Sequence, residues 1–223
     1  MRCFHALLLS ATLTAAATAG SASTLMLDFS GDVCNGGNAC ANNQQIDQSY
    51  GDIAGQLDVV YDADRTAAGL QNLRYWGPGY ETLDRVSYGT NGGGGLSILF
   101  QALAGYEVTV LGFDIAPYAN RSRNTLVQVI DTADNSLLVD QVFEPLSTSG
   151  VTSFTGVWTS AAGLQINLGP DAWDVGISNI EYKVTAISDP DPDLPPIPLP
   201  AAGWLLLAGL GGLGLAARRR NRG

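Results

Sequence analysis

Histidine, cysteine and positive charge are all scarce in this chain of 223 residues. The one histidine is His5, which lies in an apolar N-terminal stretch, so the rest of the chain has none. A Ser-His-Asp triad, a Cys-His pair and a histidine-ligated metal are therefore excluded from that remainder. Among enzymatic routes, carboxylate chemistry such as glycan hydrolysis by two acids is the one that survives.

Positive charge is outnumbered by negative charge. There are 11 Lys and Arg residues against 21 Asp and Glu residues, which gives a net charge of −10. Five of the 11 positive residues lie in the two terminal segments, so the chain between them is more acidic still. Nucleic-acid binding is excluded because phosphate recognition needs a basic surface. An acidic surface favours solubility and can supply oxygen ligands to Ca²⁺.

Two of the three cysteines, Cys34 and Cys40, flank a loop rich in Asn and Gly. An even pair in an exported protein indicates a disulfide, and the glycines permit the tight turn that it needs. The third, Cys3, precedes the apolar N-terminal run, where it is not placed for lipidation. We therefore expect a Cys34–Cys40 disulfide and no zinc site, because no histidine or further cysteine stands nearby.

Residues 1–23 have the pattern of a secretory signal peptide. One arginine precedes an apolar stretch that ends in small residues, which suits export through the Sec pathway and removal by signal peptidase. A permanent N-terminal anchor is the alternative, although Ser10, Thr12 and Thr14 interrupt the apolar run.

The C-terminal end has three parts in order. Residues 188–200 are rich in Pro and Asp, residues 201–217 carry no charge, and residues 218–223 form a basic tail. As a helix, the 17 residues of the uncharged part would be about 26 Å long, slightly less than a hydrocarbon core of ~30 Å. The pattern predicts a transmembrane helix with a cytoplasmic basic tail. A buried core helix is the alternative.

The sequence Pro198-Leu199-Pro200-Ala201, followed by the apolar segment and the arginines, resembles the PEP-CTERM class of sorting tails. The variant that it resembles carries Val-Pro-Leu-Pro-Ala, and Ile197 stands in place of the valine. The resemblance implies processing by an exosortase, with an inner-membrane intermediate before delivery to the cell envelope, surface or extracellular matrix. Such proteins are often associated with extracellular polysaccharide and biofilm.

The chain between the ends, residues 24–187, predicts an all-β domain. Short β-rich runs recur between Gly, Asn, Asp and Pro, without helical periodicity. Ten strands are expected, at 24–29, 57–61, 83–88, 96–101, 106–115, 125–131, 137–143, 152–159, 164–168 and 174–185. This number favours an antiparallel two-sheet sandwich, jelly-roll-like, with the first strand beside the last. The apolar phase switches in the last strand, so a bulge is expected at Ser178-Asn179.

The last predicted strand resembles the final strand of carbohydrate-binding-module-like jelly rolls. The corresponding motif there ends in Asp-Asn-Ile, and its acid often joins a structural calcium site near the first strand. Ser178 replaces that acid here. The resemblance implies Asp28, Asn179 and Glu181 as oxygen ligands for calcium; the alternative is that they are strand residues without a metal.

Three aromatic residues, Tyr75, Trp76 and Tyr80, lie in a segment rich in Gly and Pro. Aromatic side chains beside polar groups suit sugar rings, which stack on them, so these residues are candidate glycan contacts. Alternatively, Tyr75 and Trp76 turn inward and cover the sandwich core.

The leading hypothesis is a non-catalytic binding or structural module at the cell surface, with a polysaccharide as its ligand. The alternative is a carboxylate-dependent glycan hydrolase or lyase. Its two acids would come from Asp62, Glu81, Asp84 or Asp171. A third hypothesis is an architectural matrix component without a small ligand.

Overall fold

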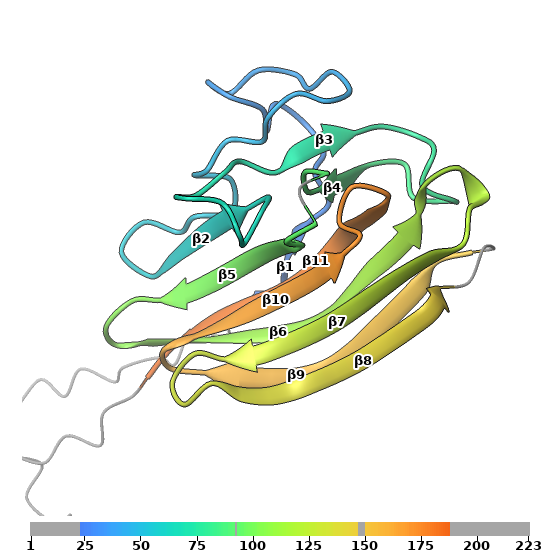
Figure 1. The fold of residues 1–223 in the computed structure, drawn as a ribbon. Coiled ribbons are helices and arrows are strands. Elements are labelled where there is room, and N and C mark those ends of the chain that lie inside the picture. Colours follow the sequence, from blue (N-terminus) through green and yellow to red (C-terminus); the bar gives the residue numbers. More distant parts are fainter. Residues whose placement is uncertain (1–22, 92, 147–149, 188–223) are drawn as a thin grey trace, which may run out of the picture. The chain divides into compact units, whose positions relative to one another are not determined.

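A computed structural model describes residues 23–91, 93–146 and 150–187 (Figure 1). The predicted signal peptide, proline-rich linker, membrane helix and basic tail lie outside these residues. Within them, no helix is long and apolar enough to span a membrane. The elements are β1 (Leu25–Leu27), β2 (Leu57–Asp62), β3 (Arg74–Trp76), β4 (Val86–Tyr88), β5 (Leu96–Ala102), β6 (Tyr106–Pro117), η1 (Tyr118–Asn120), β7 (Arg123–Asp131), β8 (Ser136–Leu146), β9 (Thr152–Ser160), β10 (Gly163–Pro170) and β11 (Val175–Ala186).

The strands form two antiparallel sheets. One has the order β3-β4-β11-β6-β9, with β1 also paired to β11, and the other has the order β2-β5-β10-β7-β8. The predicted two-sheet antiparallel sandwich is confirmed, and so is the pairing of the first strand with the last. The jelly-roll assignment stays a prediction. Strand β3 was not predicted, because its three residues show no alternation of apolar and polar side chains.

The main hydrophobic core lies between the two sheets. Alternate residues of each strand point inward. Ile98 and Phe100 of β5 and Ile166 of β10 extend from one sheet, and Val110 of β6 and Ile180 of β11 extend from the other. All five are fully buried. Each such side chain contributes roughly 1.5–3 kcal/mol through burial, so this inter-sheet core is the main source of stability.

A bulge interrupts β11 where the sequence predicted one. The pairing with β6 shifts between Ser178 and Glu181, and Asn179 has a left-handed backbone with φ of 50°. The extra residue lets both Ile177 and Ile180 point into the inter-sheet core. The predicted bulge at Ser178-Asn179 is confirmed.

The segment between β1 and β2 contains the Cys34–Cys40 disulfide, which confirms the predicted pairing. This segment is the blue trace that lies above β3 in Figure 1. Cys34 and Ile46 are fully buried, and Ile46 packs against the inter-sheet core. The amide of Gly36 also donates a hydrogen bond of 3.1 Å to Asp47, which ties the loop to the end of its own segment.

A second hydrophobic cluster lies on the other face of the six-stranded sheet. We call it the aromatic cluster; its members are Trp76, Tyr80, Leu83, Val86, Tyr88, Ala116 and Tyr118, with Val151 at its margin. Ala116 belongs to it while its neighbour Ile115 belongs to the inter-sheet core, as alternation along β6 requires. The strand beneath approaches closely at Gly176, where an added Cβ would lie 2.7 Å from Val86 and 2.9 Å from Tyr80.

Candidate ligand-binding pocket

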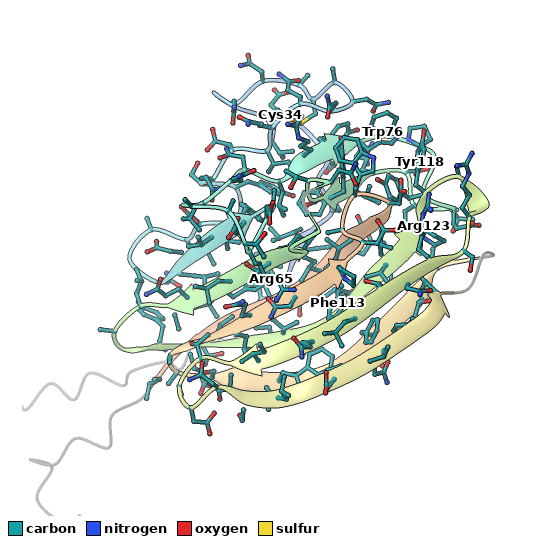
Figure 2. The ribbon with its side chains drawn as sticks, viewed as in Figure 1. Cys34, Arg65, Trp76, Phe113, Tyr118 and Arg123 are labelled. Atoms are coloured by element: carbon teal, nitrogen blue, oxygen red, sulfur yellow. A yellow bond between two sulfur atoms is a disulfide. The ribbon has the colours of Figure 1, made fainter. Side chains whose placement is uncertain are left out.

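The aromatic cluster does not close completely. It leaves a pocket of about 220 Å³ that is lined by Trp76, Tyr80, Tyr88, Tyr118, Trp173 and Asp174. These residues come from β3, the segment after it, β4, η1 and the segment between β10 and β11. We call this hollow the aromatic pocket. Figure 2 shows Trp76 and Tyr118 close together at its wall, and their ring centroids are 5.6 Å apart.

The rings meet at steep angles. The planes of Trp76 and Tyr118 cross at 82°, and those of Tyr88 and Trp173 cross at 85° with centroids 5.3 Å apart. Tyr80 leans on Tyr118 at 5.1 Å and 53°. Edge-to-face contacts of this kind are favourable between aromatic rings. Rings at such angles form walls of the pocket and not a flat platform.

Two phenol groups are used to hold the pocket together. The Tyr80 hydroxyl donates to the backbone oxygen of Trp173 at 2.8 Å, and the Tyr88 hydroxyl donates to Asn43 at 2.9 Å. Burial raises the pKa of Tyr80 and that of Tyr88 above the ordinary phenol value. Both hydroxyls therefore stay protonated and act as donors. Their ring faces remain available to the pocket.

Polar groups gather at one side of the aromatic pocket. Arg123 lies 2.6 Å from a carboxylate oxygen of Asp174 and 3.7 Å from one of Asp171 (Figure 2). Burial raises the pKa of Asp174, and the charge of Arg123 opposes this rise. The backbone oxygen of Asp174 accepts a hydrogen bond of 2.8 Å from the amide of Tyr118. The pocket thus holds a fixed carboxylate with a guanidinium directly behind it.

The predicted glycan contacts separate in the structure. Trp76 and Tyr80 line the aromatic pocket. Tyr75 packs against the inter-sheet core, because neighbouring residues of a strand face opposite sides. The inward orientation considered for this segment therefore applies to Tyr75. Sequence reasoning missed Tyr88, Tyr118 and the Trp173-Asp174 pair as partners, since no local pattern links residues so far apart.

The predicted calcium ligands lie along two different hollows. Asp28 and Asn179 line a polar hollow of about 160 Å³, whereas Glu181 and Asn179 line another of about 400 Å³. The Asn179 amide donates to Asp114 at 2.8 Å, and Asp28 accepts two hydrogen bonds from Ser30. Among the described residues there is no group of three or more His, Cys, Asp or Glu that could hold a metal. This arrangement falls short of the six to eight oxygens that Ca²⁺ takes, and calcium binding stays a prediction.

The four candidate catalytic acids occupy different surroundings. Asp62 accepts backbone hydrogen bonds at the end of β2, and Glu81 accepts one from the amide of a distant loop. Asp171 lies beside Arg123, outside the lining of the aromatic pocket. Asp84 shares a hollow with another carboxylate, that of Asp28.

The C-terminal segment gives the clearest match to known proteins. Residues 196–220 match the PEP-CTERM protein-sorting motif. The chain carries a PEP-CTERM sorting signal. Proteins with this signal are exported and sorted to the cell surface. The match contains Pro198 to Ala201, the residues on which the predicted resemblance rests, and it is confined to the tail of the chain.

Several solved structures are similar to the sandwich at low identity. CBM27-1 of Caldicellulosiruptor saccharolyticus, in complex with mannohexaose, has 12% identity, a TM-score of 0.33, and coverage of 72% of this chain and 97% of its own. The CBM22-1 xylan-binding domain of Paenibacillus barcinonensis Xyn10C has 12% identity, a TM-score of 0.31, and coverage of 78% and 99%. The Stig cyclase Fisc of Fischerella sp. TAU has 12% identity, a TM-score of 0.29, and coverage of 73% and 85%. At these scores the similarities carry no information about a ligand. None of the curated proteins compared with this chain matches it.

Proposed function

We propose that this protein is exported, processed by an exosortase and delivered to the cell surface or extracellular matrix, where its sandwich acts as a non-catalytic polysaccharide-binding module. The sorting motif at residues 196–220 supports the delivery. In this scheme the signal peptide of residues 1–23 is removed first. The apolar segment 201–217 then holds the protein in the inner membrane until cleavage near the Val-Pro-Leu-Pro-Ala-like motif releases residues 24–187 with their linker.

The single observation that carries the binding role is the open aromatic pocket. Five aromatic rings line an open hollow of about 220 Å³, so apolar ring surface stays in contact with solvent. The C–H faces of a sugar ring stack on such rings, and a few placed polar groups fix its orientation. Asp174 lines the pocket and supplies an acceptor for sugar hydroxyls.

A binding test uses the protein recovered from the surface of cells that express the full chain. We expect binding to at least one member of a broad polysaccharide panel. Trp173→Ala should weaken that binding by about tenfold or more, which is about 1.4 kcal/mol, because Trp173 forms the pocket wall and is 37% exposed. The matched control is Val157→Ala on β9, which is 77% exposed and far from the pocket lining.

Two outcomes would overturn the binding role. One is a wild-type protein that binds no member of the panel. The other is a Trp173→Ala protein that binds as tightly as the wild type and as the Val157→Ala control. Circular dichroism of both variants shows whether the sandwich is intact.

The sorting half of the proposal has an independent test. Mass spectrometry of the protein from the cell surface should give a mass that lacks the basic residues 218–223 and most of the apolar segment. Deleting the producing cell's exosortase should restore the longer form in the membrane fraction. A surface protein whose mass still includes Arg222 would contradict cleavage.

A glycan hydrolase or lyase is the second candidate, and the hollow shared by Asp28 and Asp84 is the observation that favours it. Burial alone would raise the pKa of Asp28, but hydrogen bonds from Ser30 outweigh it and lower the pKa. Asp28 would therefore be the ionised partner, and Asp84 is the second carboxylate that such a mechanism requires. Release of reducing ends by the wild type but not by Asp84→Asn would establish this function, and no release by either protein would remove it.

A further inference from the structure

We infer that the aromatic pocket recognises a single sugar residue at the end of a polysaccharide chain, and not a segment within the chain. This inference rests on the proposed polysaccharide binding and names the part of the polymer that binds.

The orientation of the rings favours a single sugar residue over a chain segment. An internal chain segment lies along a flat or gently curved row of rings, because consecutive sugars must each find a face. Here the planes of Trp76 and Tyr118 are at 82° to one another, and those of Tyr88 and Trp173 are at 85°. The rings of each pair are therefore not coplanar, so they do not form a row of parallel faces for consecutive sugars.

The depth of the pocket favours the end of a polysaccharide chain. Tyr80 and Tyr88 are 2% and 1% exposed and form its floor, whereas Trp173 stands at its rim. The segment after β3 closes against the rings as well. An added Cβ at Gly79 would lie 3.0 Å from the Tyr118 ring and 3.5 Å from the indole nitrogen of Trp76. A site with a closed floor admits the tip of a chain more readily than its middle.

The small size of the pocket also favours a single sugar residue. The pocket volume of about 220 Å³ is below the roughly 300–1,000 Å³ of sites that hold drug-sized ligands. One sugar ring is small enough for such a space, whereas an internal residue brings its two neighbours with it. Both neighbours would have to leave the pocket through glycosidic bonds on opposite sides.

The position of the Asp174 carboxylate also favours the end of a chain. One carboxylate oxygen of Asp174 pairs with Arg123 at 2.6 Å, which leaves the other oxygen to accept from a ligand. A terminal sugar keeps a free hydroxyl at the position where an internal sugar has its glycosidic bond. A carboxylate that accepts from that hydroxyl therefore distinguishes an end from an internal residue, because the internal residue has no hydroxyl there to donate.

The pocket is also held in place before any ligand arrives. The Tyr80 hydroxyl bonds to the Trp173 oxygen at 2.8 Å, the Tyr118 amide to the Asp174 oxygen at 2.8 Å, and the Ala119 amide to the Gly79 oxygen at 2.9 Å. These bonds connect all three loop segments that form the walls. A preformed site loses little conformational entropy on binding, so one sugar residue can suffice for measurable affinity.

The test is a competition experiment, in which polymers and oligosaccharides compete for binding to the protein recovered from the cell surface. The probes are pullulan, laminarin and galactomannan, each as the polymer and as its short oligosaccharides, at equal concentrations of sugar residues. Recognition of ends predicts that the short oligosaccharides compete better, in proportion to their larger number of chain ends. Competition that depends only on the concentration of sugar residues, or that is stronger for the polymer, would overturn the inference while leaving polysaccharide binding intact. Absence of any competition by polymers and oligosaccharides would instead count against the proposed function.

A pair of variants tests the part played by the carboxylate. Asp174→Asn should remove most of the advantage of the short oligosaccharides, because an amide is a weaker acceptor for the terminal hydroxyl. Asp171→Asn is the matched control, since Asp171 touches the same Arg123 at 3.7 Å without lining the pocket. It should retain the advantage. An equal advantage of the short oligosaccharides for both variants would show that Asp174 does not recognise the chain end.

Discussion

The two hydrophobic regions of this sandwich lie on opposite faces of the same six-stranded sheet and are built differently. The inter-sheet core consists mainly of aliphatic residues from alternating strand positions, and most of them are fully buried. The aromatic cluster consists mainly of Tyr and Trp from short strands and loops. It covers the outer face at one end of the sheet and leaves an open pocket.

The difference separates stability from recognition. A core closes because every buried methylene group adds to the free energy of folding. An aromatic cluster that stops short of closure keeps apolar ring faces in contact with solvent, where a ligand can cover them. We therefore expect substitutions in the inter-sheet core to change the free energy of unfolding alone, and substitutions in the aromatic pocket to change binding.

The largest expected effect is that of Phe100→Ala. Phe100 of β5 is fully buried and contacts the ring of Tyr182 across the inter-sheet core, with centroids 5.1 Å apart. Its truncation should lower the free energy of unfolding by about 3–5 kcal/mol, measured by urea denaturation. Affinity per folded molecule, measured by calorimetry at low temperature, should not change. A parallel loss of affinity would break the separation between the two regions.

The disulfide segment should behave like the inter-sheet core. Replacing both Cys34 and Cys40 with Ala should lower the free energy of unfolding by about 2 kcal/mol, as expected for a short closed loop. Affinity for polysaccharide should stay the same, because neither cysteine lines the aromatic pocket. Wild-type protein treated with a reductant should match the variant in urea denaturation. A change in affinity without a change in stability would contradict this assignment.

Alternation along the strands made most of the fold predictable. The β-rich run at 125–131 predicted the strand that the structure contains as β7, and the phase switch between Ile177 and Ile180 predicted the bulge. Strand β3 could not be predicted, because three residues are too few for a period to appear. Its position depends on pairing with β4, in which Arg74 lies opposite Tyr88.

The pocket was only partly predictable for the same reason. Trp76 and Tyr80 stand close together in the sequence and were identified, together with Tyr75, as candidate glycan contacts. Without β3, however, nothing assigned Tyr75 and Trp76 to opposite faces. Trp173 reaches Tyr80 across 93 positions, and Tyr118 belongs to a short 3-10 helix. Tertiary contacts of this range are set by the pairing of the strands, which a single sequence does not reveal.

A matched pair of tyrosines compares the two regions directly. Tyr61 in the inter-sheet core donates to the Tyr50 oxygen at 2.6 Å, and Tyr80 in the aromatic pocket donates to the Trp173 oxygen at 2.8 Å. Replacement of either by Phe keeps the ring and removes one hydrogen bond, so each should lower the free energy of unfolding by about 1 kcal/mol. Only Tyr80→Phe should weaken polysaccharide binding, because it releases Trp173. Equal effects of both variants on affinity would contradict the role of this bond.

The smallest expected effect concerns two carboxylates with opposite pKa shifts. Hydrogen bonds from the backbone of Ser49 and then from that of Gly36 lower the pKa of Asp47 in the disulfide segment. Burial raises the pKa of Asp174 at the aromatic pocket, against the opposing charge of Arg123. An unfolded Asp titrates near ~3.9. Stability from Asp47 is therefore present above this value and is lost as the pH falls through its lower folded pKa. For Asp174 the sign is reversed: its contribution is present below the unfolded value and is lost as the pH rises through the higher folded pKa.

Acid denaturation of three proteins separates these contributions. Asp28, Asp64 and Asp134 share the lowered pKa of Asp47, so the urea midpoint of the wild type should fall between about pH 5 and about pH 3. Asp47→Asn should make this fall shallower, since the variant has one fewer carboxylate that the folded state keeps ionised. Asp174→Asn should make it steeper, because protonation of Asp174 no longer offsets the loss. A steeper fall for Asp47→Asn would contradict the lowered pKa of Asp47. A shallower fall for Asp174→Asn would mean that the pocket carboxylate is held ionised by Arg123 and is no different from the acids around the core.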